Sequence, residues 1–196
     1  MVRALARPAL LAALLGGALL ASCAREVGPE PGEMALNGLF TADFDLVDMH
    51  GAPATDERFE GKPMLIYFGF ASCPDVCPAA LSVMSAGLDA LGEDAGGVQP
   101  LFVTVDPDRD TPEVLARSLA FDDRILGLTG DAAAIEAAKE SLKVAALPRE
   151  LPGSAMGYTM DHTSLFYLTD ADGVPVAALE DSMPPETLAR VVRRQL

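Results

Sequence analysis

The chain has 196 residues, half of them apolar, which is enough for one folded domain with a complete hydrophobic core. Acidic residues outnumber basic ones by 29 to 14, and the formal net charge at pH 7 is −15. Nucleic-acid-binding proteins need a basic surface, so this charge excludes that class of function. An acidic surface suits a soluble domain that meets cations or basic patches on partner proteins.

The first 22 residues are predicted to be a lipoprotein signal peptide. Arg3 and Arg7 form a short basic region, and residues 9–21 form an apolar run that is too short to cross a bilayer. The run ends at Cys23 directly after two small residues, which resembles the lipobox of bacterial lipoproteins. We therefore expect a lipid on Cys23 that holds the protein on the periplasmic side of a bacterial membrane. An ordinary signal peptide is the alternative.

Residues 23–37 follow as the attachment cysteine and a segment rich in Pro, Gly and Glu without periodicity. This composition predicts a flexible tether, and it leaves residues 38–196 as the folded domain.

The domain shows alternating strand and helix patterns. Residues 39–48 alternate loosely and end in a turn at His50 and Gly51, which predicts an N-terminal β-hairpin with a solvated histidine. Residues 147–157 hold two prolines and a glycine and are predicted to be a loop. The other predicted elements are, in chain order, strand 64–70, helix 77–91, strand 101–105, a helix from Thr111, strand 125–128, a helix 131–143 capped by Asp131, strand 165–168, strand 174–179 and a helix from 183 to the C-terminus.

This order predicts an α/β fold with a mixed central sheet and helices on both faces. The middle strands should be parallel, and the last two strands should form an antiparallel hairpin. A cysteine pair between a buried strand and a helix indicates a thioredoxin-like fold.

Cys73 and Cys77 are the first candidates for chemistry, as ligands or as a redox-active pair. They lie where a buried strand ends and a helix begins, and a helix N-terminus favours a thiolate. Residues four apart on a helix share one face, so both sulfurs could bind one metal ion or, with a bend, each other. Two thiolates favour copper or zinc. A pair of buried, inert cysteines is the alternative.

His162 is the candidate third ligand, because it lies between the predicted loop and strand 165–168. In a thioredoxin-like layout this position lies beside the cysteine turn, although the spacing alone also fits a packed structural histidine. Asp161 could orient the ring or remain a surface charge. Asp106 ends a strand, where it could support the metal or act as a turn residue. Met156 and Met160 could act as thioether ligands or packing residues.

Three segments together resemble the Sco/SenC family of copper-binding thioredoxin-like proteins, and the likeness covers about residues 38–195. They are FGFASCPDVCPAAL, VTVDPDRDTPEVL and MDHTSLFYLTDADG. The resemblance implies that Cys73, Cys77 and His162 bind copper, as Cu(I) or Cu(II). Many relatives are anchored by a transmembrane helix, and this chain differs in its predicted lipid.

The role implied by the resemblance is maturation of the dinuclear copper site, CuA, of cytochrome c oxidase. The protein would insert copper into subunit II or reduce the cysteines of that subunit. The expected partners are subunit II, other periplasmic copper carriers and the membrane. A metal-independent thiol–disulfide oxidoreductase is the main alternative, and a copper sensor is another.

Overall fold

The computed structural model describes residues 28–38, 40–74 and 76–196. The predicted signal peptide, the lipid-attachment Cys23 and the first part of the predicted tether lie outside these ranges. Within the described ranges, no helix has both the length and the apolar character needed to cross a bilayer.

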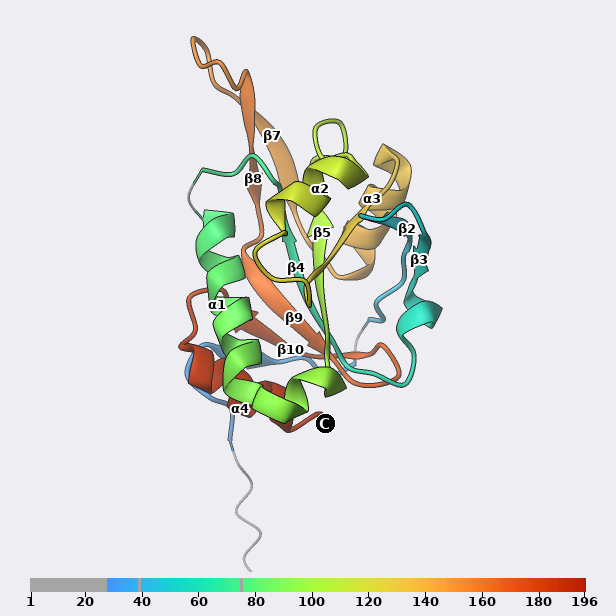
Figure 1. Ribbon diagram of the computed structural model, residues 1–196, viewed down its shortest axis with the longest axis vertical. Helices are drawn as coiled ribbons and strands as arrows, with labels where there is room; N and C mark the ends of the chain where they lie inside the picture. The colour runs from blue at the N-terminus through green and yellow to red at the C-terminus, as the bar shows by residue number, and fades with distance from the viewer. Residues whose placement is uncertain (1–27, 39, 75) are drawn as a thin grey trace, which may run out of the picture.

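An eight-stranded mixed sheet forms the centre of the fold, with the strand order β1-β10-β9-β4-β5-β6-β2-β3 (Figure 1). Its strands are β1 (Glu33–Ala35), β2 (Asp45–Asp48), β3 (Pro53–Thr55), β4 (Met64–Gly69), β5 (Gln99–Thr104), β6 (Leu126–Thr129), β9 (Leu165–Thr169) and β10 (Pro175–Glu180). β4, β5 and β6 are parallel, whereas β9 pairs antiparallel with both β4 and β10. The predicted mixed sheet, parallel middle strands and antiparallel last hairpin are therefore confirmed.

The predicted N-terminal hairpin is also confirmed, because β2 and β3 pair antiparallel around the turn at residues 49–51. The side chain of Asp48 accepts hydrogen bonds from the backbone N–H groups of His50 and Ala52, which closes the turn. Gly51 has φ +83°, a conformation that glycine adopts without strain. His50 is exposed at this tip, as the prediction of a solvated turn histidine requires.

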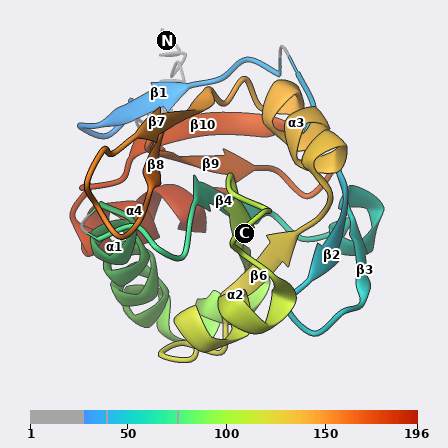
Figure 2. The same cartoon turned by 90° about the horizontal axis from the view of Figure 1, so that it is seen from above.

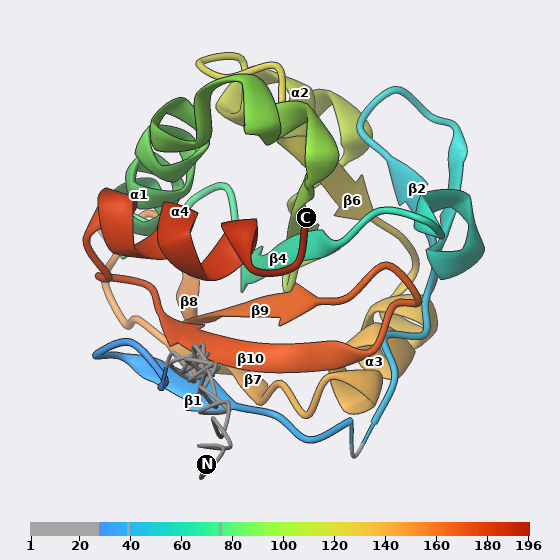
Figure 3. The same cartoon turned by 90° about the horizontal axis from the view of Figure 1, so that it is seen from below.

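Four α-helices cover the sheet in the part of the chain that the structure describes. They are α1 (Val76–Leu91), α2 (Pro112–Ser118), α3 (Ala132–Ser141) and α4 (Pro185–Arg193). α1, α2 and α4 lie on one face and α3 lies on the other, as the views from above and below both show (Figures 2 and 3). The predicted cap of α3 is present, since the Asp131 carboxylate accepts from the N–H of Ala134 at 2.8 Å. Helices on both faces of the sheet are thus confirmed.

One predicted loop is instead a two-stranded ribbon. β7 (Ala146–Glu150) and β8 (Tyr158–His162) pair antiparallel outside the main sheet and extend beyond the body of the domain (Figure 1). The prediction of a loop over residues 147–157 was wrong for β7 because it relied on Pro148. A strand with only one neighbour tolerates proline, which pairs here with Met160.

The predicted tether also needs a correction at its end. Residues 33–35 form β1, which adds to the edge of the sheet beside β10. The strand is only three residues long and mostly exposed, so the sequence shows no alternating pattern over it. Ordered structure therefore begins before residue 38.

Candidate metal and thiol site

The cysteine segment connects the end of β4 to the start of α1. The backbone N–H of Cys73 donates to the carbonyl of Phe70 at 3.2 Å, which closes a turn, and the N–H of Cys77 donates to the Cys73 sulfur at 3.4 Å. Cys73 is half-buried and Cys77 is buried, and the two sulfurs are not bonded to each other. The two cysteines are therefore a reduced pair at a helix start, with the Cys73 sulfur beside the backbone N–H of Cys77.

β4 and α1 approach each other closely, which places the Cys77 sulfur against Gly69 at the end of β4. A Cβ atom added to Gly69 would lie 3.0 Å from the Cys77 sulfur and 2.9 Å from the ring of Phe102. These separations are shorter than van der Waals contact, so only glycine leaves room for the sulfur at this point.

His162 ends β8 and meets Cys77 across 85 positions of sequence. Its Nε2 lies 3.6 Å from the Cys77 sulfur, and its Nδ1 lies 2.9 Å from the carbonyl oxygen of Thr163. Because a carbonyl only accepts, Nδ1 must donate, and in the neutral imidazole the lone pair is then on Nε2, which faces the sulfur. The rings of Tyr67 and Phe70 contact the imidazole edge-on, with centroids 6.2 and 5.9 Å away. The histidine is thus oriented as a ligand would be.

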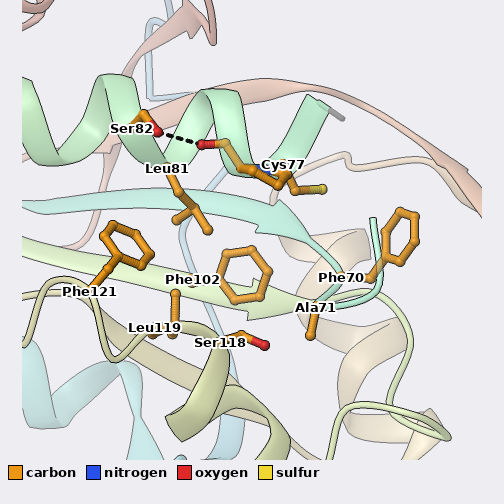
Figure 4. A pocket seen from close by; sticks show the side chains of 10 residues that line it. Phe70, Ala71, Cys77, Leu81, Ser82, Phe102, Ser118, Leu119 and Phe121 are labelled. Atoms are coloured by element: carbon orange, nitrogen blue, oxygen red, sulfur yellow. Dashed lines mark hydrogen bonds between the residues drawn. The ribbon is translucent and has the colours of Figure 1, made fainter. Parts of the chain in front are cut away.

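Burial controls the charge of Cys77. The loss of water around the thiol raises its pKa to about 12, although a hydrogen bond from the Phe70 backbone lowers it in part. An apolar pocket of about 200 Å³ between α1 and α2 explains this environment, because Leu81, Phe102 and Leu119 line it beside Cys77 (Figure 4). The helix start was expected to favour a thiolate, but at Cys77 burial outweighs it.

Cys73 faces a second hollow, of about 320 Å³, on the other side of the pair. Phe70, Pro74, Val76, Met160 and His162 are among the other residues that line it. Within the described ranges, no three Cys, His, Asp or Glu side chains already converge in metal-binding geometry. The structure therefore joins Cys77 to His162 directly, and Cys73 would have to turn its side chain to share a metal ion with them.

The carboxylates of Asp161 and Asp106 bind other side chains and not the imidazole of His162. Both carboxylate oxygens of Asp161 contact the guanidinium of Arg149, at 3.1 and 2.9 Å, and both residues line the hollow that Cys73 faces. The surface-charge alternative fits Asp161, since the carbonyl of Thr163 binds Nδ1 of His162. Asp106 is buried and accepts from Arg109 and from the hydroxyl of Tyr158. It contacts the ribbon that carries His162 and not the imidazole.

The two methionines differ in their surroundings. Met160 is half-buried against the hydrophobic core on the same strand as His162. The carbonyl of Met156 accepts a weak hydrogen bond of 3.4 Å from Arg109. Only Met160 lies beside the hollow that Cys73 faces.

A chain of polar side chains next to His162 was not predicted. Ser164 must donate to the carboxylate of Asp181, which only accepts, so the Tyr67 hydroxyl donates to Ser164 at 2.9 Å. Burial raises the pKa of Tyr67. These residues come from three separate segments, so no spacing in the sequence could have joined them.

Arg109 and Asp110 were likewise missed as parts of the site region. The Asp110 carboxylate accepts from the N–H of Ala71, at the base of the cysteine turn, and from the Thr104 hydroxyl. Burial raises the pKa of Asp110. The sequence did mark this segment, because both residues belong to the VTVDPDRDTPEVL motif.

The fold and the site define a class. A thioredoxin-like domain with a reduced cysteine pair and an imidazole beside the carboxyl end of a central strand belongs to the class of proteins that carry out thiol chemistry or bind soft metals. Residues 32–196 match the profile of the SCO1/SenC family, and the chain belongs to that family.

Individual relatives agree with this assignment. This chain is 41% identical to Bradyrhizobium japonicum ScoI, whose structure is solved with copper bound, and the TM-score is 0.74. The match covers 80% of this chain and 99% of the ScoI chain. A SCO1/SenC family lipoprotein from Bacillus anthracis is 25% identical, with a TM-score of 0.66 over 80% of this chain and 94% of that one. Protein sco1 of Schizosaccharomyces pombe is 39% identical over 76% of this chain, which spans 58% of that relative's length.

Proposed function

We propose that this protein binds a copper ion through Cys73, Cys77 and His162 and delivers it during assembly of the CuA site of cytochrome c oxidase. The observation that carries the proposal is the 3.6 Å contact between the Cys77 sulfur and Nε2 of His162. It supports the site because two sulfurs and an imidazole form a donor set that copper prefers. The related ScoI of Bradyrhizobium japonicum has been solved with copper bound.

Copper is the cargo of this site, and the protein supplies its ligands. Binding must remove the proton from Cys77, whose pKa is raised to about 12 by burial, so the positive charge of the metal replaces the proton. In the neutral imidazole of His162, Nδ1 carries the proton that is donated to the Thr163 carbonyl, so the lone pair of Nε2 is available to the metal. Cys73 is the more exposed cysteine, and it is therefore the sulfur that a recipient reaches first.

The recipient in this proposal is subunit II of cytochrome c oxidase, and other periplasmic copper carriers would supply the metal. A lipid on Cys23 would hold the protein at the periplasmic face of a bacterial membrane. Mass spectrometry of the N-terminal peptide of the mature protein tests the anchor. We expect an acylated Cys23, and an unmodified cysteine or cleavage elsewhere would contradict it.

The main experiment compares His162→Ala with His50→Ala in the reduced full-length protein. Loss of a residue that hydrogen-bonds to a metal ligand typically lowers metal affinity about 10- to 100-fold. His162→Ala removes a ligand itself, so it should weaken Cu(II) binding by more than this. His50→Ala removes the exposed turn histidine and should bind like the wild type. Unchanged copper affinity in His162→Ala would refute the ligand assignment.

Metal competition tests the identity of the cargo. Reduced protein is supplied with equal copper and zinc, and the bound metals are measured after removal of the excess. We expect copper to predominate, because two thiolates and one imidazole leave zinc without the fourth protein ligand of a structural site. Equal or preferential uptake of zinc would contradict the proposal.

A thiol–disulfide reductase is the second candidate, favoured by the 3.4 Å contact between the N–H of Cys77 and the Cys73 sulfur. Cys73 would attack a recipient disulfide, which forms a mixed disulfide and releases one recipient thiol. Cys77 would then attack the Cys73 sulfur, which forms the internal disulfide and releases the second thiol. His162→Ala should retain this reaction, and Cys73→Ser should lose it, so the two variants separate the candidates.

A further inference from the structure

The ribbon that carries His162 has little structural support of its own. Among the residues that the structure describes, β7 and β8 pair only with each other, and an isolated pair of strands is marginally stable in water. Four of the five residues of β7 are exposed. The position of the imidazole therefore depends on the contacts that β8 makes with the body of the domain.

Arg109, in the loop between β5 and α2, makes several of these contacts at once. Its Nη1 donates to the carbonyl oxygens of Tyr158 at 2.9 Å and of Met156 at 3.4 Å. Its guanidinium carbon lies 3.8 Å from the centre of the Tyr158 ring, which is a stacking contact. One arginine thus holds both the backbone and the side chain of the ribbon.

Asp106 fixes the arginine and the tyrosine together. One carboxylate oxygen accepts from Nε of Arg109, and the other accepts from the Tyr158 hydroxyl at 2.7 Å. The carboxylate is 3% exposed, so these charged hydrogen bonds are shielded from water. The three residues form one connection between the β5–α2 loop and the ribbon, in which Asp106 is buried and Arg109 and Tyr158 are half-buried.

The same guanidinium lies against the cysteine turn. Its carbon is 5.9 Å from the centre of the Phe70 ring, and the Phe70 ring also contacts the imidazole of His162. Phe70 also supplies the carbonyl that accepts from the N–H of Cys73. Arg109 therefore touches the segments that carry both kinds of candidate ligand.

We propose that Arg109 is the positioning residue of the metal site and sets the distance between His162 and the Cys73–Cys77 pair. Arg109 acts through the ribbon and Phe70 and does not itself bind the metal. The inference rests on the proposed copper site. Lysine cannot replace the arginine, because an ammonium lacks the planar fork that reaches Asp106 and two carbonyls together.

The test is a double-mutant cycle that combines Arg109→Lys with His162→Ala in the reduced full-length protein. Cu(II) affinity is measured for all four proteins, and nitrogen coupling in the electron paramagnetic resonance spectrum reports imidazole ligation. Arg109→Lys alone should weaken binding about 10- to 100-fold and reduce the nitrogen coupling. In the His162→Ala background, Arg109→Lys should change Cu(II) affinity less than about twofold, because the imidazole that Arg109 positions is absent.

Arg193→Lys is the matched control, because Arg193 likewise pairs with an aspartate, Asp94, and donates to two backbone carbonyls, but lies outside the hollow that Cys73 and His162 line. It should bind copper like the wild type. Tyr158→Phe keeps the stacked ring but loses the hydroxyl bound to Asp106, and it should weaken binding in the same direction as Arg109→Lys but less.

The outcomes separate this inference from the proposed function. If His162→Ala does not weaken Cu(II) binding, the copper site itself is wrong. If His162→Ala weakens binding but Arg109→Lys matches the wild type, the positioning role is wrong and the copper site stands. Equal losses from Arg109→Lys in both backgrounds would mean general structural damage, and they would also overturn the positioning role.

Discussion

Replacing Gly69 with alanine tests the packing that places Cys77 beside His162. The new Cβ atom would lie 2.9 Å from the Phe102 ring, 3.0 Å from the Cys77 sulfur and 3.0 Å from the Tyr67 ring. All three neighbours are buried and belong to different parts of the core, so no flexible side chain end can move away. The neighbours must separate by about 0.5–1 Å to restore ordinary contact distances.

This displacement has a predictable cost. Overpacking of a dense core by one methyl group destabilises a protein by about 1–3 kcal/mol. For a domain of this size, that change lowers the melting temperature by about 2–12 °C. Because the Cys77 sulfur is one of the displaced atoms, the 3.6 Å contact with His162 should also change, and copper affinity should fall.

The assays are thermal unfolding of the reduced metal-free protein and Cu(I) competition with a chromogenic chelator. Gly96→Ala is the control, because nothing lies within 4 Å of its added Cβ and its φ is not positive. It should leave both measurements unchanged. A Gly69→Ala protein with wild-type melting temperature and copper affinity would refute the close-packing argument.

Three further predictions address charge, capping and thiol reactivity. The hydrogen bond from Arg124 lowers the pKa of Asp122 to about 2 from its usual 3.8, so this carboxylate contributes stability above pH 3.8 that is lost as the pH falls to 2. Denaturant unfolding of Asp122→Asn should therefore show a deficit of about 1–2 kcal/mol near neutral pH that disappears in acid, and a deficit independent of pH would contradict this. Asp131→Ala removes the cap of α3 and should lower the free energy of unfolding by about 0.5–2 kcal/mol, whereas an unchanged value would mean that water replaces the cap. Iodoacetamide at pH 8 should modify Cys73 faster than the buried Cys77, whose pKa is about 12, and peptide mass spectrometry that finds Cys77 modified first would refute the assignment.

The central strands and helices could be predicted from local patterns. The continuous apolar run of β4 has all six residues buried, as a central strand with both faces covered requires. The periodic apolar residues of α1 and the cap at Asp131 likewise identify helices from adjacent residues alone. Such signals are reliable because they depend on interactions within a few positions of the chain.

The ribbon and β1 could not be predicted in this way. The ribbon is a pair of five-residue strands and β1 is a single strand of three residues, none of them deeply buried. Pro148 in β7 is also a signal that usually indicates a loop. Their pairing is decided by partners elsewhere in the chain, so the local residues do not reveal it. The prediction of a loop failed over residues 147–150 for this reason, whereas residues 151–157 do form a loop.

The sequence by itself determined the cysteine pair at the start of a helix, the parallel centre of the sheet and the motifs of the SCO1/SenC family. Only the tertiary structure decided that His162 lies 3.6 Å from Cys77 and that Arg109 connects the ribbon to the cysteine turn. Helix and strand patterns follow from neighbouring residues, whereas a site follows from side chains that meet across 85 positions and are held in place by packing.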